Sequence, residues 1–177
     1  MFGYIKNIIK NKCLKDAAVR TGRRREVAYN FETAKTMSVI YPFNINMSGI
    51  MNVLKNITKQ YDIEIVLVMY FPQEKLPEGV GENSPSQIFF SNNECNWFGK
   101  PKTAAINSFI NTKFNILVDL SIKVWFPLQY IATASHADFK IGRINSETNN
   151  PYDFVLAGSA DDERFFKDLE TYLCKIK

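Results

Sequence analysis

The sequence has few of the residues that build metal sites and disulfide frameworks. Its 177 residues include one histidine, His136, and three widely separated cysteines without CxxC spacing, namely Cys13, Cys95 and Cys174. Zinc sites need several such ligands at short spacing, and disulfide-rich domains carry more cysteines, usually in even number. We therefore expect reduced thiols and no structural metal.

Long apolar segments are also missing. No run approaches the roughly 18 consecutive apolar residues that span a bilayer, and the N-terminal stretch lacks the uninterrupted apolar region of a secretory signal. We therefore expect a cytoplasmic protein.

The glycine motifs that hold phosphates are absent. The first predicted strand continues into Tyr41-Pro-Phe-Asn44 with no GxGxxG, and no GxxxxGK[ST] occurs anywhere in the chain. Gly79 and Gly81 lie in a proline-rich stretch that does not open a helix. These absences argue against dinucleotide or nucleoside triphosphate binding, and we expect no cofactor.

The composition is that of a folded protein with an uneven charge. Hydrophobic residues make up 46% of the chain and aromatic residues 14%, which is enough for a sizeable core. The net charge is +4, but residues 1–36 hold nine Lys or Arg against three acids, whereas the remainder holds thirteen against fifteen. An anionic partner should therefore meet the N-terminal part first.

Apolar runs and helical spacings alternate along the chain. Strands are predicted at 36–43, 63–71, 87–91, 115–120, 139–142 and 152–156. Helices are predicted at 2–25, 47–60, 103–112, 125–137 and 161–176. This alternation predicts an α/β fold, a three-layer Rossmann-like sandwich around a mostly parallel sheet of five to six strands, in the order 3-2-1-4-5-6.

The first predicted helix is basic and amphipathic. Its apolar residues fall within an arc of roughly 140° at helical pitch; they are Phe2, Ile5, Ile8, Ile9 and Cys13. Such a stripe fits either contact with lipid or docking on the domain. We divide the chain into a basic N-terminal arm, residues 1–30, and a single Rossmann-like domain, residues 31–177.

Polar residues follow several predicted strands, where open α/β sheets bind ligands. The candidate ligand-binding residues are Asn44, Asp119, Ser121 and Arg143. Asp119 could orient a ligand hydroxyl or act as a base. An aspartate at this position also commonly accepts hydrogen bonds from loop amides. Arg143 suits a phosphate or carboxylate, although a solvated arginine at a strand end is as common.

The basic residues of the arm form the second candidate surface. They are Lys12, Arg20, Arg23, Arg24 and Arg25. Arginine and lysine suit phosphate and carboxylate partners, so RNA, the ribosome or an acidic protein are the expected partners, with an anionic membrane less favoured. The alternative is a solvated helix end whose cations stabilise the helix dipole.

Two resemblances concern the segment Phe114-Asn-Ile-Leu-Val-Asp-Leu-Ser121. With Ala137-Asp-Phe-Lys-Ile-Gly-Arg143 and the turn Trp97-Phe-Gly-Lys-Pro101, it resembles an uncharacterised family of small Bacteroidota-type bacterial α/β proteins, which implies no known activity. Over about thirty residues, to Asp119 and Gly142, it is also similar to the N-terminal domain of heptosyltransferase-type glycosyltransferases. The glycine-Asp step and the second nucleotide-binding domain of those enzymes are absent.

The sequence therefore favours a non-catalytic binding module that attaches through its basic arm to an anionic macromolecule or a protein partner. The alternative is a small enzyme or ligand-binding domain, a degenerate glycosyltransferase-like protein, with its pocket at the carboxyl ends of the central strands.

Overall fold

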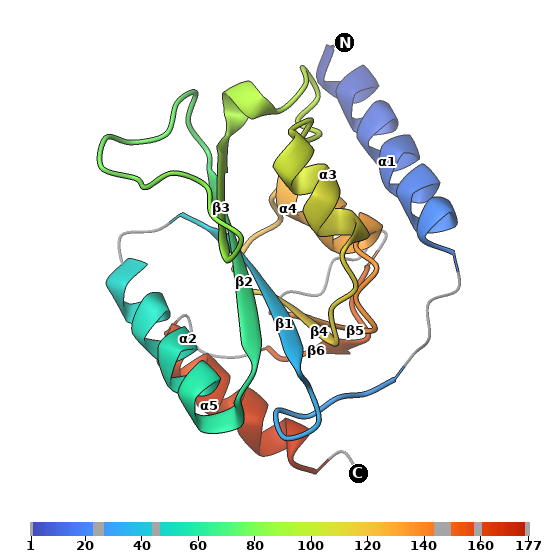
Figure 1. Cartoon of the computed structure of the whole chain (residues 1–177). Coiled ribbons are helices and arrows are strands. Elements are labelled where there is room, and N and C mark those ends of the chain that lie inside the picture. The colour runs from blue at the N-terminus through green and yellow to red at the C-terminus, as the bar shows by residue number, and fades with distance from the viewer. Residues whose placement is uncertain (1, 23–26, 44–46, 144–149, 158–160, 176–177) are drawn as a thin grey trace.

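The computed structural model describes residues 2–22, 27–43, 47–143, 150–157 and 161–175 (Figure 1). Its six strands are β1 (Thr36–Pro42), β2 (Glu64–Phe71), β3 (Gln87–Ser91), β4 (Ile116–Asp119), β5 (Phe139–Gly142) and β6 (Phe154–Val155). They form one sheet in the order β3-β2-β1-β4-β5-β6, and all five neighbouring pairs are parallel. The predicted fold class and strand order are confirmed.

The described part of the chain also contains five α-helices and one short 3-10 helix. They are α1 (Phe2–Thr21), α2 (Met47–Tyr61), η1 (Asn92–Glu94), α3 (Ala104–Asn111), α4 (Phe126–Ala134) and α5 (Asp162–Leu173). Helix α1 ends at Thr21, before Gly22 with its φ of 67°, and residues 23–25 of the predicted helix lie outside the described residues. None of these helices is both long and apolar enough to cross a membrane.

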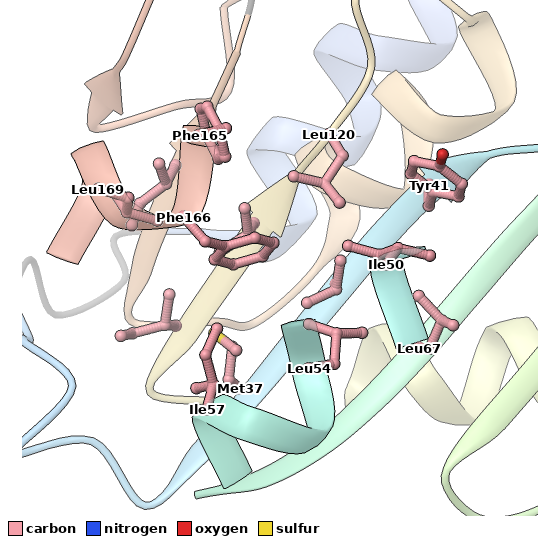
Figure 2. Close-up of a cluster of buried hydrophobic side chains, with 14 of the residues drawn as sticks. Met37, Tyr41, Ile50, Leu54, Ile57, Leu67, Leu120, Phe165, Phe166 and Leu169 are labelled. Atoms are coloured by element: carbon pink, nitrogen blue, oxygen red, sulfur yellow. The ribbon is translucent and has the colours of Figure 1, made fainter. Parts of the chain in front are cut away.

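Helices α2 and α5 cover one face of the sheet (Figure 1). On α2 the buried residues Ile50, Leu54 and Ile57 recur at helical spacing, so they form one stripe against the sheet. On β1, Met37 and Tyr41 point into the same cluster, since alternate side chains of a strand face the same side. Figure 2 shows these side chains meeting Leu67, Leu120 and the residues of α5.

Helices α3 and α4 cover the other face, and α1 packs against α4 (Figure 1). All nine residues of α4 are buried. A helix that is buried on every side needs neighbours on two opposite sides. Here the sheet lies on one side of α4 and α1 on the other.

Helix α1 docks through only part of its apolar arc, since Cys13 packs against the core while other residues of the arc are exposed. Its buried residues are Leu14 and Ala17, whereas Ile5 and Ile8 are 47% and 51% exposed. At the end of the helix, the Thr21 hydroxyl lies within donating distance of the carbonyl oxygens of Thr133 and Ala134, at 3.3 and 3.2 Å. Most of the contact with the domain therefore comes from the second half of α1, and Tyr4, Ile5 and Ile8 of the first half are exposed.

Candidate functional site

The candidate ligand residues lie at the carboxyl edge of the sheet, where the strand order reverses between β1 and β4. The helix after β1 covers one face and the helix after β4 covers the other, so a crevice is expected between these two strand ends. Asp119, Ser121 and Arg143 all lie at this edge, as predicted, whereas Asn44 lies outside the described residues.

Asp119 is a buried carboxylate held by its own chain. It accepts hydrogen bonds from the backbone N–H of Ser121 at 2.8 Å and from the hydroxyl of Tyr152. Burial raises the pKa of Asp119, and the hydrogen bonds from Ser121 and Tyr152 oppose this rise. Burial, together with the Asp119 charge, also raises the pKa of Tyr152 well above its usual value. Both carboxylate oxygens therefore have internal partners.

Arg143 forms a buried ion pair with the first residue of α5. Its Nη1 donates to Asp162 Oδ1 at 2.9 Å and to the Leu120 carbonyl at 3.3 Å, and its guanidinium lies 4.3 Å from the centre of the Phe165 ring. The other oxygen of Asp162 accepts from the hydroxyl of Tyr41 at 3.2 Å. These contacts join β1, β4, β5 and α5 inside the crevice.

One edge of this guanidinium has no partner. Arg143 Nε and Nη2 are buried and make no hydrogen bond within the described residues, and the same holds for Ser121 Oγ. Nε and Nη2 lie on the same edge of the planar group, the edge that binds two oxygens of a carboxylate or phosphate. This edge is the chemically unsatisfied feature of the site.

The open space beside Asp119 is small. A cavity of about 10 Å³ is lined by Asp119, Ser121, Lys123, Val124, Trp125, Gln129 and Tyr152. That volume holds about one water molecule. Among the residues that the structure describes, no group of three His, Cys, Asp or Glu could hold a metal ion.

A larger cavity lies between α1, α3 and α4. It measures about 410 Å³, and its lining includes Arg20, His136, Asn107 and Tyr130. It opens on the side where α3 and α4 end, away from Asp119 and Arg143. His136 is therefore not part of the carboxyl-edge site.

The candidate basic residues of α1 and the thiol of Cys95 are not part of the carboxyl-edge site. Lys12 and Arg20 are exposed on α1, and the Arg20 Nε donates to the Asp16 carbonyl at 3.2 Å. Arg23, Arg24 and Arg25 lie outside the described residues. Burial raises the pKa of Cys95 to about 11, so this thiol is a poor nucleophile at neutral pH.

Sequence reasoning missed three residues of the site. Tyr152 was assigned to the last strand, which begins only at Phe154. From the sequence, Asp162 is recognisable only as a residue at the start of a helix, and Tyr41 only as a residue of a buried strand. Their roles depend on contacts between distant segments that no local pattern encodes.

Gly142 makes room for Tyr152. A Cβ atom at Gly142 would lie 2.4 Å from Cδ2 of the Tyr152 ring. We predict that Gly142→Ala displaces the ring, breaks its hydrogen bond to Asp119 and lowers the free energy of unfolding by about 1–3 kcal/mol.

Gly81→Ala is the matched control for urea unfolding, because a Cβ there meets nothing within 4 Å. We expect it to change the free energy of unfolding by less than about 0.5 kcal/mol. Equal effects of the two substitutions would contradict the packing described for Tyr152.

Comparison with known proteins gives a family without an activity. No protein with a curated description and no solved structure matches the chain significantly. The family model described as "Family of unknown function (DUF6913)" matches residues 5–176. The match covers nearly the whole sequence, so the chain belongs to the uncharacterised family DUF6913.

Proposed function

We propose that the protein is a non-catalytic binding module that attaches to an anionic partner through the outer face of α1. The observation that carries the proposal is the docking of this helix. Leu14 and Ala17 hold its second half on the domain, while Ile5, Ile8 and the lysines of the outer face stay accessible. A helix that only completed the core would not leave its larger apolar residues in solvent.

The charge of α1 supports an anionic partner. Across Phe2–Thr21 five basic residues stand against one acid, Asp16. Lys12 and Lys15 are exposed, and their three-residue spacing places them on one side of the helix. RNA, the ribosome or an acidic protein surface would be attracted to this face, in a cytoplasmic bacterial setting.

The chemistry of the carboxyl edge supports a role without catalysis. Asp119 already accepts two internal hydrogen bonds, and the adjacent cavity holds about one water molecule. A general base needs an accessible lone pair directed at a substrate proton. The buried Cys95, whose pKa is raised to about 11, does not supply an alternative nucleophile.

A charge reversal tests the proposal. We predict that Lys12→Glu/Lys15→Glu weakens binding to a labelled heparin oligosaccharide and lowers the slope of log affinity against log salt by about two. The matched control is Lys55→Glu/Lys59→Glu on α2, where both lysines are exposed. Each variant lowers the formal net charge from +4 to zero, so any difference reports on position.

Similar losses in the two variants would mean that net charge alone governs binding, and the proposal would be wrong. No measurable heparin binding by the intact chain at low salt would also refute it.

The unpartnered edge of Arg143 favours a second candidate, a small-ligand domain. Nε and Nη2, together with Ser121 Oγ, offer three unpaired polar groups to a carboxylate or phosphate that enters the crevice. The local similarity to heptosyltransferase-type glycosyltransferases suggests sugar phosphates as ligands within this candidate.

A thermal-shift series with phosphate, sugar phosphates and carboxylates tests this candidate. A ligand at about 100 times its Kd should stabilise the protein by about 2.7 kcal/mol, or roughly 5–10 °C. Arg143→Lys keeps the charge but removes the two-donor edge, and it should abolish the shift. Ser121→Ala should reduce the shift, because it removes a buried hydroxyl beside Asp119.

The absence of any shift in the intact chain would exclude the ligand-domain candidate. A full shift in Arg143→Lys would exclude this arginine as its binding residue.

A further inference from the structure

The first two turns of α1 extend past the start of α4. Lys10 lies over the ring of Phe126, the first residue of α4, and Thr21 contacts Thr133 and Ala134 at the end of α4. The two helices therefore run in the same direction. With a rise of 1.5 Å per residue, the residues before Lys10 project about 10 Å beyond the start of α4, at the carboxyl edge of the sheet (Figure 1).

This projection presents apolar side chains to solvent. Tyr4 is 74% exposed, and Ile5 and Ile8 are about half exposed. More than half of each of three further apolar side chains is exposed in the loops that follow β3 and β4 at the same edge; they are Trp97, Ile122 and Val124. We call these six residues the overhang surface.

The segments of the overhang surface are joined by ring contacts beneath them. The Trp97 ring lies 5.4 Å from that of Phe98, which lies 6.3 Å from that of Phe126 under Lys10. Val124 stands two residues before Phe126 in the same chain segment. These contacts connect the loop of Trp97, the start of α4 and Lys10 of α1.

Lysines surround the overhang surface. Three ammonium groups lie 4.3–5.0 Å from aromatic ring centres: Lys10 over Phe126, Lys123 over Trp125 and Lys100 over Tyr130. Lys6, Lys12 and Lys102 add to the positive charge of the same segments. Glu94 accepts from the backbone N–H of Ser91.

We infer that the overhang surface binds an anionic lipid bilayer, inserting its apolar side chains at the headgroup level while the lysines meet lipid phosphates. This inference rests on the proposed function, whose partner it names. Four of the six side chains are aliphatic, namely Ile5, Ile8, Ile122 and Val124, and give no stacking surface for RNA bases, whereas a fluid interface accepts them without a matching shape. Tyrosine and tryptophan side chains are enriched at the headgroup level of membranes.

The structure removes the main argument against lipid. In the sequence, the apolar stripe of the first helix had a competing use, since it could dock on the domain. The docking face consists mainly of Leu14, Ala17 and Thr21, with Cys13 of the stripe packed beside them, whereas Ile5 and Ile8 remain exposed. A stripe that the domain does not bury is free for an external apolar phase.

Vesicle co-sedimentation tests the inference with the full chain. With vesicles of phosphatidylcholine containing about one third phosphatidylglycerol, we expect binding that is absent from pure phosphatidylcholine. Tyr4→Ser/Ile8→Ser should weaken it by at least about tenfold. Val19→Ser/Tyr172→Ser is the matched control, since it also removes one exposed aliphatic residue and one exposed tyrosine, but outside the overhang surface, and it should bind normally.

Tryptophan fluorescence distinguishes insertion from attachment. The chain has two tryptophans, so Trp125→Phe leaves Trp97 as the single reporter. Lipids brominated on their acyl chains should quench Trp97 emission in this variant if the overhang surface inserts. Binding without quenching would overturn the insertion.

The outcomes also separate the inference from the proposed function. If heparin binding still depends on Lys12 and Lys15 but anionic vesicles are not bound, the inference is wrong and the proposed function stands. The inference is likewise wrong, and the proposed function stands, if the Tyr4→Ser/Ile8→Ser variant loses RNA binding or self-association instead. If neither heparin nor vesicles are bound, both are wrong.

Discussion

The buried ion pair between Arg143 and Asp162 holds the carboxyl edge of this domain together. It connects the end of β5 to the first turn of α5, and through Tyr41 and Leu120 it reaches β1 and β4. Removing one partner of such a pair typically costs 3–5 kcal/mol, because the other charge stays buried without compensation. Helix α5, which completes the core on its face of the sheet, is positioned by this contact.

The ion pair lies at the sheet edge where many folds of this topology bind ligands. Little space remains beside Asp119, so groups that elsewhere meet a ligand here meet one another. On the outside of the molecule, α1 covers the buried α4 with its second half and extends its first turns beyond the start of α4. The unpaired edge of Arg143 is the feature at the sheet edge that favours a bound carboxylate or phosphate.

Much of this fold follows from the sequence, and the site follows in part. The apolar strands 36–43, 63–71 and 115–120 are readable because buried parallel strands are nearly continuous in hydrophobicity. Asp119, Ser121 and Arg143 meet because parallel strands end at the same edge. The partners Tyr152 and Asp162 were not predictable, since they come from segments beyond β5 whose placement is set by packing. The sequence left open whether the apolar stripe of α1 docks on the domain, because periodicity gives Ile5 and Ile8 as much weight as the smaller Ala17 that contacts the core.

Hydrogen exchange along α1 tests the central claim most directly, because it reads docking and exposure in one helix. We predict protected amides from about Lys10 to Thr21 and faster exchange before Lys10, with the first turns becoming protected when anionic vesicles are added. Rapid exchange throughout α1 would show that the helix does not dock on α4 and would contradict the account. Strong protection of the first turns in the free protein would contradict it equally, because the overhang surface would then already be covered.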